Sequence, residues 1–266
     1  MRLIVSGRQA VLDHGYVELV EAWGSDERIV EAARMSTGRG FKGWGPKECR
    51  ACGAGTAVPR GGPGSGFPPS PCCKGTGQVP GDEKLLRFLW EHQHRTPFEM
   101  AGMTVEVQAP IFVFREWHRH RTQSYNEMSA RYTPLPDVNY VPSVERLMMP
   151  RDARNKQAAG VADVEMTVAG AEAHRAMLVE LYAALERTYQ ASLGEGIPKE
   201  LARIVLPVGR YSRMRASANL RNWLAFLTLR LDPAAQWEIR EYADAVGKLV
   251  VAAFPRTWEL FAEGLR

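Results

Sequence analysis

The feature that most restricts how this chain can fold is the segment 38–81, which is unusually rich in glycine and proline. Twenty of its 44 residues are Gly or Pro, whereas the other 222 residues contain only 21. Glycine loses much backbone entropy in a helix or strand, and proline lacks the amide hydrogen that both structures need. We therefore expect 38–81 to be an inserted module within a single domain that spans 1–266.

All four cysteines of the chain lie in this segment, at Cys49, Cys52, Cys72 and Cys73. The first two form a CxxC pair, and the second pair follows after nineteen residues, a spacing similar to that of a zinc ribbon. The nearby glycines allow backbone amides to face the thiolates. A structural zinc site is predicted, although two adjacent cysteines are irregular for one. Free thiols in a loop and a redox pair remain alternatives.

The rest of the chain alternates between strand and helix patterns. Strands are predicted at 15–23, 103–108 and 208–218. Helices are predicted at 26–35, from 83 to about 95 with Asp82 as the cap, from Pro110 onward, in a long amphipathic segment at about 163–193, and at 198–206, 219–231 and 233–254. This mixture predicts an α+β fold, with a modest antiparallel or mixed sheet packed against several helices.

Composition excludes few function classes. Hydrophobic residues make up 45% of the chain, the formal charge is +4, and there is no long apolar run to span a membrane. The N-terminus has no apolar signal core, so a cytoplasmic protein without membrane contact is expected. The mild positive charge suits small anionic ligands and is too weak to indicate nucleic acid.

The segment 115–132, REWHRHRTQSYNEMSARY, concentrates the polar chemistry. It contains four arginines, two histidines and two glutamates. Arg119, His120 and Arg121 are consecutive, so they point in different directions and cannot share one helix face. Arginine pairs well with phosphate, and Ser129 and Arg131 can add to a phosphate site. A solvated surface loop and a nucleic-acid patch are the alternatives, the latter because aromatic residues alternate with basic ones.

Within this segment, RHRTQSYNEMSARY at 119–132 resembles the RHRxxSxNExSxR signature of flavin-dependent thymidylate synthases, with every fixed position met. The similarity extends to AARMS at 32–36, HQHRTPFE at 92–99, APIFVFREW at 109–117, ARIVLP at 202–207, NLRNWLAFLTLR at 219–230 and AQWEIREYA at 235–243. It covers nearly all of the chain except 38–81, so the cysteine module is not part of the usual family pattern.

The resemblance implies an enzyme, a methyltransferase that converts dUMP to dTMP. It also implies a homotetramer with flavin sites shared between subunits, with methylenetetrahydrofolate and NADPH as co-substrates. The implied FAD contacts are Ser36, His94, Thr96, Arg119, His120, Arg121, Glu127, Asn219 and Arg221. The implied dUMP contacts are Glu116, Arg119, Glu127, Ser129, Ala130, Arg131, Arg203 and Arg230.

The chemistry is consistent with this resemblance. Methylation at C5 of uracil needs extra electron density, which a cysteine thiolate can provide by adding at C6. No cysteine lies near 115–132, whereas a reduced flavin can deliver hydride instead. Arg230 is the expected catalytic residue, since a guanidinium beside N3 and O4 stabilises the ionised ring. Taken alone, Arg230 could equally answer a helix dipole, Arg203 could be a surface arginine, and His94 could cap a helix.

Two positions depart from what the family leads us to expect. Glu116 replaces an expected Gln and is predicted to pair with an arginine or to accept a ribose hydroxyl, because a carboxylate repels phosphate. Ala225 stands where an Asn can face FAD, so one flavin contact is expected to be missing. Two rival functions remain: a nucleic-acid-binding module and a flavin enzyme acting on another nucleotide.

Overall fold

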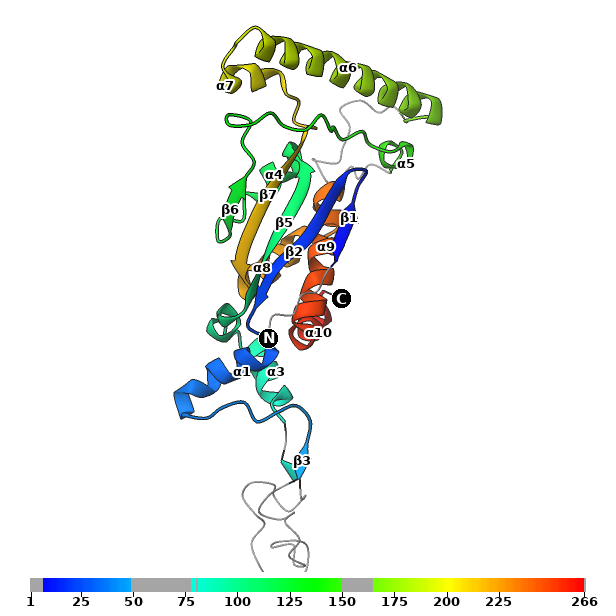
Figure 1. Ribbon diagram of the computed structural model, residues 1–266. Coiled ribbons are helices and arrows are strands. Elements are labelled where there is room, and N and C mark those ends of the chain that lie inside the picture. Colours follow the sequence, from blue (N-terminus) through cyan, green and yellow to red (C-terminus); the bar gives the residue numbers. More distant parts are fainter. Residues whose placement is uncertain (1–6, 49–77, 80, 150–164, 266) are drawn as a thin grey trace, which may run out of the picture. The chain divides into compact units, whose positions relative to one another are not determined.

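The computed structural model describes residues 7–48, 78–79, 81–149 and 165–265, and its helices and strands are labelled in Figure 1. The chain divides into two compact units. The first comprises Met1–Ala22 and Gly102–Ala253, and the second comprises Trp23–Ala101 and Phe254–Arg266. All four cysteines lie outside the described residues, so the zinc site and the inserted module stay predictions. A single domain over 1–266 also stays a prediction.

The first unit is built on a five-stranded sheet with the order β1-β2-β5-β7-β6. Its strands are β1 (Arg8–Val11), β2 (Gly15–Trp23), β5 (Gly102–Pro110), β6 (Ser124–Glu127) and β7 (Tyr211–Asn219). The pairs β1–β2, β5–β7 and β6–β7 are antiparallel. The α+β prediction is confirmed. The strand predicted at 15–23 is confirmed at both ends, and the strand predicted at 208–218 begins later, at Tyr211.

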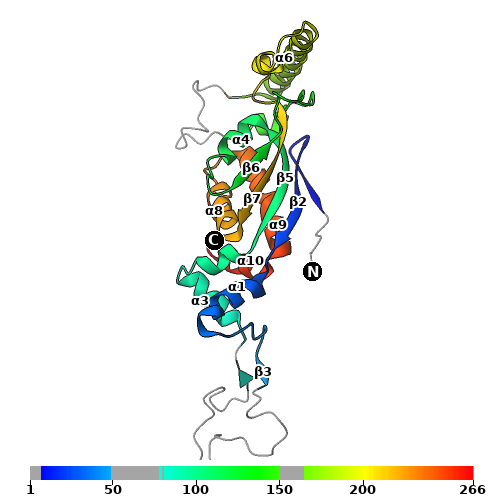
Figure 2. The same ribbon diagram turned by 60° about the vertical axis from the view of Figure 1, so that its left-hand side comes forward.

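Helices α4 (Ile111–Trp117), α8 (Leu220–Arg230) and α9 (Trp237–Ala253) pack on one face of this sheet (Figure 2). Alternate β5 residues, Met103, Val105 and Val107, are fully buried. The buried Trp223 indole donates a hydrogen bond to the Met103 carbonyl at 2.9 Å, which ties α8 to the sheet. Trp117 of α4 packs against α8 across this core. The helix expected from Pro110 onward is confirmed, with Pro110 at its N-cap.

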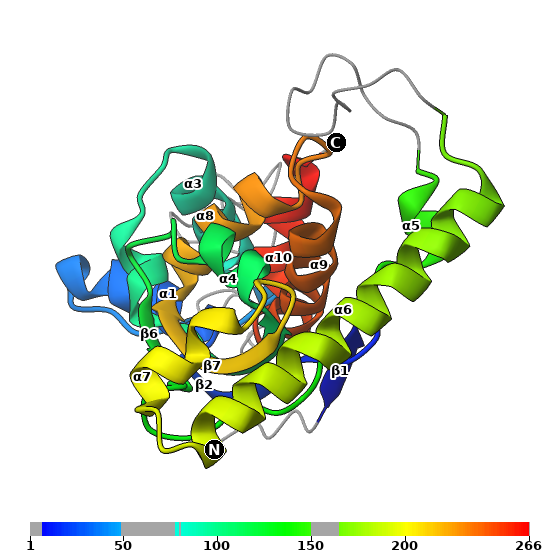
Figure 3. The ribbon, with the colours of Figure 1, turned by 90° about the horizontal axis from the view of Figure 1, so that it is seen from above.

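The longest helix, α6 (Val168–Gly194), contacts three short helices: α5 (Val144–Leu147), α7 (Lys199–Ala202) and the 3₁₀ helix η3 (Arg203–Val205) (Figure 3). Only two of its residues are buried, Ala171 and Tyr189. Met177, Val179 and Leu181 are each about half exposed. The prediction of a long helix is confirmed. The expected amphipathic pattern is wrong, because several apolar residues of α6 are exposed to solvent.

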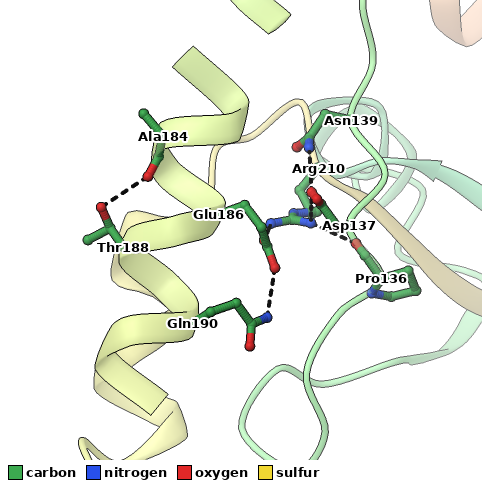
Figure 4. Close-up of polar contacts among 8 residues, drawn as sticks. All are labelled: Pro136, Asp137, Asn139, Ala184, Glu186, Thr188, Gln190 and Arg210. Atoms are coloured by element: carbon green, nitrogen blue, oxygen red, sulfur yellow. Dashed lines mark hydrogen bonds and ion pairs between the residues drawn. The ribbon is translucent and has the colours of Figure 1, made fainter. Parts of the chain in front are cut away.

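Arg210, a buried arginine just before β7, connects α6 to the sheet. Arg210 is fully buried, and its guanidinium lies between α6 and the 136–139 segment (Figure 4). It forms an ion pair with Glu186 of α6 and donates to the Pro136 carbonyl and the Asp137 carboxylate, each at 2.8 Å. The Arg210 carbonyl accepts from the Ile111 amide at 3.0 Å, where α4 begins. Arg210 therefore positions several segments at this end of the sheet.

The second unit contains α1 (Asp26–Arg34), the 3₁₀ helices η1 (Met35–Thr37) and η2 (Thr96–Met100), the strand pair β3 (Lys47–Glu48) and β4 (Gln78–Val79), α3 (Glu83–Glu91) and α10 (Pro255–Glu263). Asp82 stands at the N-cap of α3 as predicted, but its carboxylate pairs with Arg34 and accepts from the Lys42 amide instead of capping the helix. Buried Asp26 accepts from the Thr257 hydroxyl at 2.6 Å and joins α1 to α10. In the described parts of both units, no helix is long and apolar enough to cross a membrane.

Candidate active site

The first unit contains a cavity of about 550 Å³ at the end of the sheet where α6 and α7 lie. One face of α4 and the residue after it contribute Ile111, Phe114, Arg115 and His118, at the helical spacing i, i+3, i+4, i+7. The remaining lining residues come from 127–135 and from 200–208: Glu127, Met128, Ser129, Ala130, Leu135, Glu200, Arg203, Ile204, Leu206, Pro207 and Val208.

Four of the eight predicted dUMP contacts line this cavity: Glu127, Ser129, Ala130 and Arg203. Glu127 ends β6, and the chain then turns, with the Tyr132 amide donating to the Ser129 carbonyl at 3.0 Å. Exposed Arg203 begins η3. Its guanidinium and the Ser129 hydroxyl give the cavity a cation and a hydrogen-bond donor, the two kinds of group that bind phosphate.

Arg131 lies beside the cavity without lining it. The Arg131 amide donates to the Ser129 hydroxyl at 3.3 Å, and its guanidinium lies 3.9 Å from the carboxylate of Glu200, which does line the cavity. Both side chains are more than half exposed. This ion pair is therefore weak, and it leaves Arg131 available to an anionic ligand at the cavity edge.

Three other predicted residues form a separate cluster around Arg230, the last residue of α8. The Arg230 guanidinium donates to His120 Nε2 at 2.9 Å, to the Glu116 carboxylate at 3.1 Å and to the Glu116 carbonyl at 2.9 Å. Glu116 thus pairs with an arginine, one of the two arrangements expected for it. Neither Glu116, His120 nor Arg230 lines the cavity. Apart from exposed Arg119, the predicted dUMP contacts therefore fall into two groups, one at the cavity and one at Arg230.

The charge states in this Arg230 cluster follow from burial. Burial and the charge of Arg230 lower the pKa of His120 to about 4. His120 is therefore neutral near pH 7, and the lone pair of its Nε2 can accept a hydrogen bond from Arg230. Burial raises the pKa of Glu116, while Arg230 opposes the shift. The guanidinium is held at three points, so its direction is fixed.

Four of the predicted flavin contacts of the first unit belong to the 119–123 segment and the start of α8, which a hydrogen bond joins: Arg119, Arg121, Asn219 and Arg221. Asn219 caps α8 by accepting from the Asn222 amide at 3.0 Å, and the Asn222 side chain donates to the Thr122 carbonyl at 3.4 Å. Arg119, Arg121 and Arg221 are exposed. Cations beside a helix N-terminus suit a diphosphate such as that of FAD, because the helix dipole and free amides favour negative charge.

The other predicted flavin residues, Ser36, His94 and Thr96, belong to the second unit and are exposed there. Ser36 lies in η1, and Thr96 begins η2. Ala225, the departure from the family pattern, is an exposed residue of α8.

Several cavity residues are missing from the sequence-based set, among them His118 and Arg115. His118 lies one position before the 119–131 signature, and it lines the cavity. Its spacing from Ile111 and Phe114 could have identified it, because residues seven and four positions apart share one helix face. Arg115 was missed for the same reason. Motif matching selects fixed signature positions and passes over neighbouring residues that the helix geometry brings to the same site.

Comparison with known proteins identifies the family of this chain. Residues 18–256 match the family described as thymidylate synthase complementing protein. A flavin-dependent thymidylate synthase of Thermus thermophilus is 36% identical over 96% of this chain and 78% of its own length. That of Thermotoga neapolitana is 34% identical over 94% of this chain and 92% of its own. The UMP/dUMP methylase PolB from Streptomyces cacaoi, solved with 5-Br UMP, has a TM-score of 0.71 at 29% identity, covering 97% of each chain. This chain therefore belongs to the flavin-dependent thymidylate synthase family.

Proposed function

We propose that this protein converts dUMP to dTMP with bound FAD, methylenetetrahydrofolate as the carbon donor and NADPH as the reductant. The observation that carries the proposal is the cavity that gathers Glu127, Ser129, Ala130 and Arg203. The relative from Streptomyces cacaoi, which was solved with 5-Br UMP and with 5-Br dUMP, supports a pyrimidine nucleotide as the ligand. A cytoplasmic location remains a prediction.

In this proposal the cavity binds the nucleotide. Arg203 and Arg131 bind the phosphate, with the Ser129 hydroxyl and nearby backbone amides completing its contacts. Glu127 has a different task, because a carboxylate repels phosphate. It lies at the end of β6, beside the turn that holds Ser129, and it can accept hydrogen bonds from the sugar or base.

FAD would be held by Arg119, Arg121, Asn219 and Arg221. The three arginines supply positive charge, and Asn219 caps the N-terminus of α8, so together they fit the diphosphate of FAD. Bound flavin, when reduced, supplies the hydride that the methylation requires. Ser36, His94 and Thr96 are proposed as further flavin contacts.

Arg230 is proposed to stabilise the uracil ring as N3 ionises. A guanidinium has five N–H groups. In Arg230 three of them donate to described residues: to His120, to the Glu116 carboxylate and to the Glu116 backbone carbonyl. The other two can donate to the O4 and N3 edge of the base. Because the guanidinium is already fixed, little reorganisation accompanies the reaction.

The separation of the two groups supports a site completed between copies of the chain. The proposed phosphate-binding residues Arg203 and Ser129 line the cavity, with Arg131 at its edge, whereas Glu116 and Arg230 do not line it. Self-association as a homotetramer would place the Arg230 cluster of one copy against the cavity of another. The exposed apolar residues Met177, Val179 and Leu181 of α6 provide surface that such an assembly would bury.

The test is tritium release from C5-labelled dUMP by the purified protein. We expect release that depends on FAD, methylenetetrahydrofolate and NADPH, and that stops when any of the three is omitted. A parallel assay with labelled UMP distinguishes dUMP from the ribonucleotide. A nucleic-acid-binding module would be colourless and inactive, so a protein without flavin absorbance that releases no tritium would contradict the proposal.

We also propose that Cys49, Cys52, Cys72 and Cys73, which lie outside the described residues, bind one structural zinc ion. Four thiolates can close a tetrahedral site without a histidine, and no histidine occurs in 38–81. Metal binding can order a segment that has too few apolar residues for a core. Metal analysis of protein purified without chelator should find about one zinc per chain.

A further inference from the structure

Glu200 brings a carboxylate to the cavity, beside the two arginines that we propose bind the phosphate. It is the second residue of α7, and it lines the cavity together with Arg203, which lies three positions further along the chain. Its carboxylate lies 3.9 Å from the guanidinium of Arg131 at the cavity edge. Its carbonyl accepts from Nε of Arg203 at 3.4 Å. Glu200 is therefore in contact with both arginines.

The carboxylate of Glu200 is accessible to a ligand, while its backbone is tied to the cavity edge. The side chain is 60% exposed, and it belongs to the set of residues that line the open volume. The neighbouring residue, Lys199, donates from Nζ to the Tyr132 carbonyl at 3.2 Å, which joins α7 to the turn after β6. The carboxylate can thus turn away from Arg131 and still remain close to any group bound at the two arginines.

A carboxylate at this position competes with phosphate for the same cations. A phosphate bound to Arg131 and Arg203 would displace Glu200 from Arg131, at little cost because the exposed ion pair is weak. The two anions would still lie within a few ångströms of each other, where like charges repel measurably even in water. This repulsion grows with the charge of the ligand, and a second phosphate group adds roughly one negative charge. The penalty is therefore smallest for a monophosphate.

We propose that Glu200 makes the cavity selective for nucleoside monophosphates, because its carboxylate repels the additional phosphate groups of diphosphates and triphosphates. This inference rests on the proposed function, since it takes the occupant of the cavity to be a pyrimidine nucleotide with its phosphate at Arg131 and Arg203. It assigns Glu200 a role in specificity, and it implies that the same carboxylate also weakens the binding of dUMP.

The test measures the affinities of dUMP and dUDP by calorimetry on the FAD-loaded protein at low ionic strength, where charges are least screened. Gln has nearly the size of Glu but no charge. In Glu200→Gln we therefore expect dUMP to bind about five-fold and dUDP about ten-fold more tightly than in wild type. Glu200→Asp keeps the charge and should bind both nucleotides nearly as wild type does. Glu195→Gln removes the same charge from an exposed residue outside the cavity lining, and it is the matched control.

The outcomes separate this inference from the proposed function. If Glu200→Gln gains no more affinity for dUDP than for dUMP, or gains no more than Glu195→Gln does, the role of Glu200 is rejected while the proposed function stands. If dUDP binds neither wild type nor Glu200→Gln, its exclusion does not depend on Glu200, and the role is rejected as well. If wild type does not bind dUMP, the proposed function itself fails, and this inference fails with it.

Discussion

The cavity and the Arg230 cluster use similar residues in opposite ways. In the cavity, Arg203 and Glu127 are exposed and face open volume. In the cluster, the Arg230 and Glu116 side chains are only 18% and 28% exposed, and they form an ion pair with each other. The cavity is suited to receiving a ligand, whereas the cluster is suited to holding one cation in a fixed direction.

This difference separates binding from catalysis. An exposed arginine gains most when an anion arrives, so its loss should weaken binding. A cation that the protein already fixes costs little reorganisation when charge develops in the transition state, so its loss should slow the reaction. The two regions should therefore respond differently to the same Arg→Ala change.

The largest expected effect is that of Arg230→Ala. Loss of a preorganised charge should reduce turnover at saturating dUMP by roughly 100- to 1000-fold. FAD content is measured on the same protein, because Arg230 donates to His120, a predicted flavin contact, and turnover is compared per bound flavin. Arg8→Ala removes an exposed arginine of β1 that pairs with Glu18 and lies over the Tyr16 ring, outside both regions, and it serves as the control. Near-normal turnover of Arg230→Ala at saturating dUMP would refute the catalytic role.

Arg203→Ala should instead act mainly on affinity. Loss of a charge-assisted hydrogen bond should weaken dUMP binding by about 1.5–3 kcal/mol, roughly 10- to 150-fold, with turnover at saturation much less affected. Arg131→Ala is expected to behave in the same way, with Arg8→Ala again as the control. Calorimetry with dUMP measures the effect, and unchanged affinity in both variants would remove the phosphate-binding assignment.

A smaller effect concerns pH and His120. Its pKa of about 4 in the folded protein lies below the ordinary 6.5, so the unfolded chain takes up this proton first as pH falls. The contribution of neutral His120 to the free energy of unfolding is therefore fully present above about pH 6.5 and is lost as pH falls toward 4. Because the ring is partly exposed, we expect a loss of roughly 1 kcal/mol. Denaturant unfolding at pH 7 and 5 should show a smaller drop for His120→Gln than for wild type, and equal drops would contradict this.

The smallest expected effect on activity is that of the cysteines. Replacing Cys49, Cys52, Cys72 and Cys73 with Ser should abolish the proposed zinc binding and leave turnover per flavin nearly unchanged, because the proposed chemistry uses no thiolate. Tritium release and metal content are measured on the same preparation. A variant that is folded, tetrameric and flavin-loaded but inactive would show that a cysteine takes part in the reaction.

Sequence patterns predicted most of the fold because the main elements have strong periodicity or clear caps. β2 and α8 are examples: one alternates, and the other follows the capping residue Asn219. β6 was not predicted, because Ser124–Glu127 is polar and becomes a strand only by pairing with β7. The exposed apolar residues of α6 were misjudged for a related reason: periodicity does not say which apolar residues the rest of the chain covers.

The site was predictable as a set of residues but not as an arrangement. The signature identified Glu127, Ser129 and Arg131, which follow one another closely. The pairing of Arg230 with Glu116, 114 positions away, depends on how α4 and α8 pack and has no local signal. The contacts of Arg210, which join the residue before β7 to α6 and to the 136–137 segment, likewise have no local signal.

The most direct test of a site completed between copies of the chain is subunit complementation. Arg203→Ala and Arg230→Ala subunits, carrying different tags, are co-expressed, and the material that carries both tags is assayed at dUMP well below the wild-type KM. If one copy supplies the cavity and another supplies Arg230, some sites contain neither substitution, and activity should recover to about a quarter of wild type at most for random pairing. If each site is built within one chain, every site keeps one substitution, and the mixed material would be no more active than the average of the two variants.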